Sequence, residues 1–148
     1  MSDDLSELRA YQYHEIEVGR KETRDYVITS EVYENFLSAF HDYSPVHVDE
    51  AYARSRGFDS RVMHGTLLQG FISHFIGMHF PGKLSLLLAV DMRYSNPSYL
   101  GDAICIDMVV KQKTDTHQIV VLDATLSNTT REHLAARARI SVMVKGEF

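Results

Sequence analysis

One long apolar segment limits the possible folds more than any other part of the chain. It runs from Thr66 to about Phe80, follows His64-Gly65 and stops at Pro81-Gly82. A helix that is apolar on most sides is a buried helix, and Pro-Gly cannot continue it. We therefore expect one long central helix over about residues 65–80. Its apolar positions are Leu67, Leu68, Phe71, Ile72, Phe75, Ile76 and Met78.

The chain after this segment has the patterns of strands. Leu84–Val90 is a continuous apolar run, which is typical of a strand buried on both faces. The runs Ala103–Gln112, Gln118–Ser127 and Leu134–Lys145 follow, separated by turn residues, and no internal repeat occurs. Helices early and strands late predict an α+β domain, in which an antiparallel β-sheet wraps around the central helix.

Shorter elements are expected before the central helix. Two β-favouring pieces cover Tyr13–Val18 and Asp25–Thr29. Ser30 is a good N-cap for the amphipathic helix that follows it. Asp49 can cap a second short helix over Glu50–Arg56, which Gly57 would close.

Length, charge and cysteine content restrict the class of protein. A chain of 148 residues is one ordinary domain, here 1–148, and residues 1–10 form a polar, flexible lead-in. The net charge of -5 argues against nucleic-acid and anionic-membrane partners. The acidic N-terminus is unlike a secretory signal, and the single Cys105 fits a reducing compartment as a buried, inert thiol. We therefore expect a cytoplasmic protein.

The expected architecture leaves surface uncovered. A single sheet around a single helix has a far face and edge strands that need protection, and a second copy of the chain can supply it. The sequence therefore predicts a homodimer or a higher homo-oligomer.

An acid, an imidazole and a helix start lie close together in the sequence. Asp42 and His47 flank Pro45, which forbids a regular helix there and favours an irregular segment. The helix start at Gly65 offers unpaired N–H groups. These groups suit acid–base chemistry on a carbonyl compound. Taken alone, Asp42 could be an ordinary turn residue and His47 a structural histidine.

A metal site is the other chemical interpretation of these residues. The spacing lacks a regular helical histidine pair, and a proline interrupts it. We therefore expect no metal and no cofactor. The candidate ligands in that alternative are His41, Asp42, His47, Asp49 and His64.

The central segment also carries a stripe of small residues, Thr66, Gly70, Ser73 and Gly77. A glycine inside a helix costs about 1 kcal/mol relative to alanine. The stripe therefore indicates close approach by another backbone or a slender ligand.

Five features follow one another at characteristic spacings: DYSPVHVD at 42–49, AYA at 51–53, MHGTLL at 63–68, Ser73, and NPxxxGD at 96–102. In this order and spacing they resemble the MaoC-like (R)-specific enoyl-CoA hydratases, a branch of the hot dog fold. The similarity covers roughly Arg24 to Val144. It implies a sheet around a central helix, protomers paired edge to edge, and a thioester substrate that enters between them.

The resemblance also implies roles for single residues. Asp42 and His47 would activate water, and the N–H of Gly65 would polarise the thioester carbonyl. Ser73 would support the catalytic pair. Such a protein would be a lyase of fatty acid metabolism, which adds water to a trans-2-enoyl-CoA to give an (R)-3-hydroxyacyl-CoA.

Three further positions would shape the substrate site. Ser44 stands where the family usually has asparagine, so its hydrogen bonds to substrate or loop would differ. Met63 is bulkier than the usual residue and would narrow the acyl pocket. His64 would cap or brace the loop. Two alternatives remain open: a dehydratase of another acyl thioester, of polyketide or branched dicarboxylate type and on CoA or a carrier protein, and a non-catalytic acyl-thioester binder.

Overall fold

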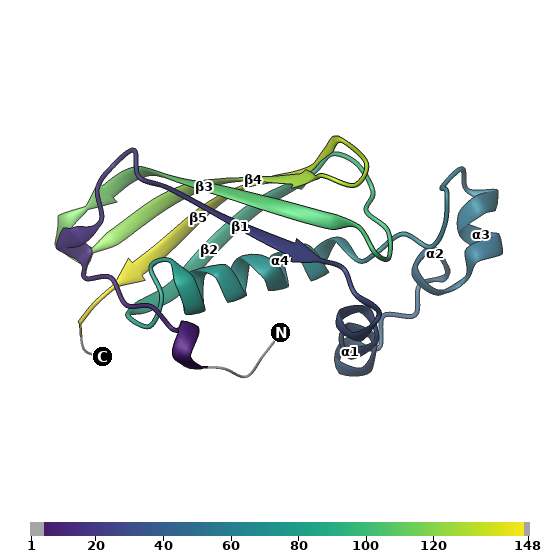
Figure 1. Cartoon of the computed structure of the whole chain (residues 1–148), viewed down its shortest axis with the longest axis horizontal. Coiled ribbons are helices and arrows are strands. Elements are labelled where there is room, and N and C mark those ends of the chain that lie inside the picture. Colours follow the sequence, from purple (N-terminus) through teal and green to yellow (C-terminus); the bar gives the residue numbers. More distant parts are fainter. Residues whose placement is uncertain (1–4, 147–148) are drawn as a thin grey trace.

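A curved antiparallel sheet covers one side of a central helix in the computed structural model, which describes residues 5–146 (Figure 1). The sheet has five strands in the order β1-β3-β4-β5-β2, and every neighbouring pair is antiparallel. The strands are β1 (Lys21–Val27), β2 (Ser85–Tyr94), β3 (Ala103–Thr114), β4 (Ile119–Asn128) and β5 (His133–Val144). The predicted α+β architecture is confirmed.

The central helix is α4 (Gly65–His74), and it continues through a π-helical turn, η3 (Phe75–His79). Its apolar side chains and the inward-facing side chains of the strands form one buried cluster. The predicted helix over about 65–80 is therefore confirmed. The expectation that it is buried on nearly all sides is wrong, because the small residues Thr66, Gly70, Ser73 and Gly77 form an exposed face.

Three short helices lie beyond one end of the sheet: α1 (Ser30–Phe40), α2 (Pro45–Val48) and α3 (Glu50–Ser55) (Figure 1). The N-cap of α1 is Thr29, one residue before the predicted Ser30, and its hydroxyl accepts a hydrogen bond from the N–H of Val32 at 3.2 Å. Asp49 caps α3 as predicted, since its carboxylate accepts from the N–H of Tyr52 at 3.0 Å.

Two strand predictions need correction. The segment around Tyr13 forms a short 3-10 helix, η2 (Tyr13–Glu15), rather than a strand. The apolar run after residue 84 belongs to β2, but β2 is an edge strand with β5 as its one neighbour in the sheet. Leu86 and Leu88 are consequently 50% and 44% exposed instead of buried on both faces.

The first described residues are held against the far end of α4. A 3-10 turn, η1 (Leu5–Glu7), is followed by Arg9, whose N–H donates to the carbonyl of Met78 at 2.9 Å. A Cβ at Gly82, which has a φ of 82°, would lie 2.1 Å from the Arg9 carbonyl oxygen, so this approach needs glycine. Arg9, within the predicted lead-in 1–10, thus has a defined backbone contact, and residues 1–4 lie outside the described part. The flexibility of the lead-in stays a prediction.

Between residues 5 and 146, no helix is both long enough and apolar enough to cross a membrane.

Candidate active site

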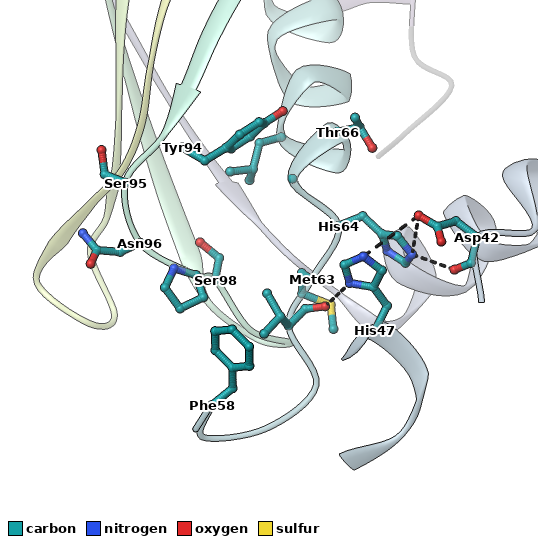
Figure 2. Close-up of a pocket in the computed structure, with 14 residues that line it drawn as sticks. Asp42, His47, Phe58, Met63, His64, Thr66, Tyr94, Ser95, Asn96 and Ser98 are labelled. Carbon is teal, nitrogen blue, oxygen red and sulfur yellow. Dashed lines mark hydrogen bonds and ion pairs between the residues drawn. The ribbon is translucent and has the colours of Figure 1, made fainter. Parts of the chain in front are cut away.

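A pocket opens at the N-terminal end of α4, where three segments distant in sequence meet (Figure 2). The α1–α2 connection, the loop into α4 and the loop after β2 form its wall, and its volume is about 520 Å³. The lining residues include Asp42, His47, His64 and Gly65. The structure therefore brings together the acid, the imidazole and the helix start that the sequence singled out.

His47 presents a free nitrogen to this pocket. Its Nδ1 lies 2.7 Å from the carbonyl oxygen of Val62. Because a carbonyl only accepts hydrogen bonds, Nδ1 carries a proton, and Nε2 is the nitrogen left to face the pocket. Nε2 lies 4.0 Å from Oδ2 of Asp42. The second ring nitrogen is thus directed toward a carboxylate.

The local fold around His47 differs from the expectation of an irregular segment. Pro45 occupies the first turn of α2, and the N–H of His47 donates to the carbonyl of Ser44 at 2.8 Å. Proline is tolerated there, because the first N–H groups of a helix have no partner within it. His47 is consequently fixed on a helical turn.

Asp42 follows the residue that ends α1. That residue, His41, has a φ of 55°, so the chain turns sharply before Asp42. Oδ1 of Asp42 accepts from the N–H of Ser44 at 3.2 Å, whereas Oδ2 faces the two imidazoles (Figure 2). The Asp42 side chain is 50% exposed, so water can reach the carboxylate.

His64 braces this turn from the buried side. Its side chain is 1% exposed, and its Nε2 lies 2.9 Å from the backbone oxygen of Asp42. Nε2 must therefore carry the proton. The other nitrogen, Nδ1, has no partner in the described part of the chain. This arrangement agrees with the predicted bracing role and leaves His64 without a free lone pair in the pocket.

The metal alternative has partial support from distance alone. Asp42, His47 and His64 each offer a ligand atom, and these atoms lie within 4.8 Å of one another. A metal on Nε2 of His64 would require its proton to move to the buried Nδ1, for which no acceptor is present among residues 5–146. The carboxylate of Asp49 caps α3, away from this group. The three residues are thus not a preformed ligand set.

Gly65 lies where the pocket meets the first turn of α4. A Cβ at this position would be 2.9 Å from Cε1 of Tyr94, whose ring covers the glycine. The hydroxyl of Tyr94 in turn accepts from Nε2 of Gln69 at 3.0 Å. The first N–H groups of α4 have no partner within the helix, so a donor faces this corner.

Of the remaining predicted site residues, some line the pocket and others do not. Met63 is 4% exposed and lines the pocket, as does His64. Ser44 and Ser73 are exposed, and neither lines the pocket. Ser73 lies about two turns along α4 from Gly65. Its support of the catalytic pair and the substrate contact of Ser44 stay predictions.

Several pocket residues were missed from the sequence. Phe58, Tyr94 and Ser98 line the pocket, and the loop after β2 contributes most of one wall. The NPxxxGD motif marked this loop as a turn, but no local pattern indicated that it faces His47.

Cys105 lies on β3, outside the pocket lining. Burial, together with a hydrogen bond to Asp25, raises the pKa of its thiol to about 11. It is therefore unsuited to act as a nucleophile.

Comparisons with known proteins find similar sequences and similar folds. A family model described as "MaoC like domain" matches residues 13–132. The chain is 27% identical over 107 residues to an (R)-specific enoyl-CoA hydratase of Aeromonas caviae, which covers 72% of this chain and 80% of the relative. It is 34% identical over 84 residues to a mitochondrial 3-hydroxyacyl-[acyl-carrier-protein] dehydratase of Arabidopsis thaliana, which covers 57% of this chain.

That match spans about half, 48%, of the plant relative's length. Among solved structures, the R-hydratase PhaJ1 from Pseudomonas aeruginosa in its unliganded form has a TM-score of 0.85 and 27% sequence identity to this chain. The superposition covers 95% of this chain and 89% of that one.

Proposed function

Because the chain belongs to the MaoC-like domain family and has its hot dog fold, we propose that it is a hydratase/dehydratase of acyl thioesters. In the specific form of this proposal, it adds water to a trans-2-enoyl-CoA and gives an (R)-3-hydroxyacyl-CoA. The observation that carries the proposal is the convergence of His47 Nε2 and Asp42 Oδ2 on one pocket, 4.0 Å apart.

The proposed chemistry begins with a water molecule held between these two atoms. Nε2 of His47 accepts one proton from the water while the oxygen of the water bonds to C3 of the substrate. Asp42 accepts a hydrogen bond from the other O–H of the water. The electrons of the C2–C3 double bond move toward the thioester oxygen. The imidazolium then returns its proton to C2, so that one water is added and neutral His47 is restored.

Gly65 is the proposed electrophilic partner. As negative charge develops on the thioester oxygen, an N–H at the helix start stabilises the enolate more than the ground state. The side chains of Met63 and His64 would form the substrate wall beside it. Elimination of water from a 3-hydroxyacyl thioester would use the same steps in reverse.

The named relatives differ in the carrier of the acyl group, CoA in one and acyl-carrier protein in another. A direct test follows the enoyl absorbance of crotonyl-CoA, with crotonyl-carrier protein in parallel. Wild type should consume the enoyl band, and Asp42→Asn and His47→Gln should each lower kcat on the order of 10²–10⁴-fold. His41→Gln, an exposed histidine beside the site, is the matched control.

Two results would contradict this proposal. One is wild-type protein that turns over neither thioester. The other is a pair of dyad variants that retain wild-type rates, which would place the chemistry elsewhere. Measurable CoA-ester affinity without turnover would instead support the alternative of a non-catalytic binder.

We propose, in addition, that two copies of the chain pair through β2. This edge strand leaves Leu86, Leu87 and Leu88 between 37% and 50% exposed. An exposed apolar edge strand is an aggregation site unless another strand covers it. Antiparallel pairing with the β2 of a second copy would cover it in a closed twofold dimer.

A further inference from the structure

We propose that Arg131 is a positioning residue for the proposed reaction. It joins the loop after β2 to the loop that leads into α4 as a clamp, and the second loop carries the carbonyl of Val62, the hydrogen-bond acceptor of His47. Arg131 lies in the turn between β4 and β5, and its side chain is 32% exposed. It does not line the pocket. Its effect must therefore pass through other residues, and this inference rests on the function proposed for the site.

One end of the clamp is a buried carboxylate. Asp102 is 3% exposed and accepts from Nε of Arg131 at 3.0 Å. The same carboxylate oxygen accepts from the amide of Asn128 at 2.7 Å and from the N–H of Tyr99 at 2.9 Å. Charge-assisted bonds of this kind are strong, and a buried carboxylate needs all its donors. The loop after β2 is thereby fixed to the β4–β5 turn.

The other end of the clamp reaches the loop that leads into α4. Nη1 of Arg131 donates to Oδ2 of Asp59 at 2.9 Å. The guanidinium lies 3.9 Å from the centre of the Tyr99 ring. The hydroxyl of Tyr99 accepts from the N–H of Asp59 at 3.2 Å. Arg131 and Tyr99 therefore join two loops that are about forty residues apart in the chain.

These loops fix the position of Val62. Val62 forms an isolated β-bridge with Tyr99, and the N–H of Met63 donates to the carbonyl of Ser98 at 2.9 Å. The carbonyl of Val62 is the group that accepts from Nδ1 of His47. A continuous chain of contacts thus links Arg131 to Tyr99, Tyr99 to Val62, and the carbonyl of Val62 to Nδ1 of His47. The last contact determines which nitrogen of the proposed base carries the proton.

The chain contains a matched control for the loss of an arginine. Arg139 on β5 makes a two-point contact with Asp123, at 2.9 and 3.3 Å, but its side chain is 64% exposed on the outer face of the sheet. It is not among the residues that line the pocket. Arg139→Gln removes an exposed ion pair, comparable to the pair between Arg131 and Asp59, and leaves the loops intact.

The first measurement is kinetic. Arg131→Gln and Asp59→Asn should lower kcat on the order of 10- to 100-fold, with a smaller change in KM, at a temperature where circular dichroism shows each variant folded. Their effects should not add in the double variant, because both act through one loop. Arg139→Gln should keep the wild-type kcat. Asp59→Asn keeps the buried Asp102 pair, so it remains informative if Arg131→Gln does not fold.

The second measurement needs no turnover. Long-range ¹H–¹⁵N spectra of the histidine rings, assigned with His47→Gln, report which nitrogen carries the proton. Wild type should show the Nδ1–H tautomer for His47, and Asp59→Asn and Arg131→Gln should show a mixture. A His47 spectrum that is the same in all three proteins overturns the inference, whether or not the wild type has hydratase activity. Wild-type kcat in folded Arg131→Gln and Asp59→Asn also overturns it.

Discussion

The imidazole rings of His47 and His64 pack against each other in a tilted arrangement, with centroids 3.9 Å apart and 32° between their planes, and each commits one nitrogen to a backbone carbonyl. Those carbonyls set opposite tautomers, with the proton on Nδ1 in His47 and on Nε2 in His64. The buried ring therefore packs against the outer one, and its Nε2 is already committed to the backbone of Asp42. In the proposed mechanism, this arrangement leaves Nε2 of His47 as the one base that acts on the water.

Replacement of His64 should separate support from chemistry. His64→Phe keeps an aromatic ring against His47 but removes the donor to the carbonyl of Asp42, so kcat should fall on the order of tenfold. Steady-state kinetics with crotonyl-CoA measure this effect, and the exposed His117→Phe serves as the control. An unchanged kcat together with a lower melting temperature would limit His64 to a structural role.

Gly65 should tolerate no side chain. In Gly65→Ala, the new Cβ would press on the Tyr94 ring, which Gln69 holds, so both activity and packing at the pocket should suffer. Gly70→Ala lies on the same helix with no atom within 4 Å of its Cβ. That control should raise the free energy of unfolding by about 0.5–1 kcal/mol. Urea unfolding and kinetics of both variants give the comparison, and normal activity in Gly65→Ala would refute it.

Two histidines at the far end of α4 predict a dependence of stability on pH. Burial lowers the pKa values of His74 and His79 below the ordinary 6.5, and Arg24 lowers them further while Glu7 opposes the change. As the pH falls below about 6.5, the histidines of the unfolded chain therefore take up protons before those of the folded chain. The free energy of unfolding should decrease as the pH falls below about 6.5, and it should keep its full value at higher pH.

Urea unfolding between pH 7.5 and about 5 measures this loss. His74→Gln and His79→Gln should each flatten the curve, whereas His14→Gln, at an exposed site, should not. The N-terminal Arg9 and the hydroxyl of Tyr26, 3.0 Å from Nδ1 of His74, also face this cluster. A curve with the same slope in all four proteins would show that other groups set the acid sensitivity.

The edge strand β2 gives a prediction on assembly. Wild type should have about twice the 16.9 kDa chain mass by light scattering, and Leu86→Lys combined with Leu88→Lys should give the mass of a single chain. Leu100→Lys, at a position that is 38% exposed outside the strands, is the control. A wild-type monomer, or a dimer that survives both lysines, would rule out pairing through β2.

The long apolar segments were the predictable part of this fold. The central helix and the last three strands could be found from periodicity and turn residues, because their burial pattern is local. The position of β2 within the sheet could not be predicted from its leucines. The same apolar run is compatible with a central strand and with an edge strand that pairs with another chain. Likewise, Pro45 is expected to break a helix, but it begins a short one, because proline is favoured at the first helical position.

The sequence predicted the side chains that meet at the site, but not the backbone groups that orient them. Asp42, His47 and Gly65 stand out by residue type and spacing, and the structure gathers them in one pocket. The acceptor that sets the His47 tautomer is the backbone carbonyl of Val62, and every residue carries such a group. Ser73, whose catalytic role comes from the resemblance, is exposed and does not line the pocket.

The widened turn from Phe75 to His79 has an effect at the opposite end of the polypeptide. Such a turn holds one residue more than a regular helix, which rotates everything after it by about 100°. The carbonyls of Met78 and Pro81 then meet the N–H groups of Arg9 and Tyr11 at 2.9 and 3.1 Å. Deletion of a single residue here would move both acceptors away from these two donors.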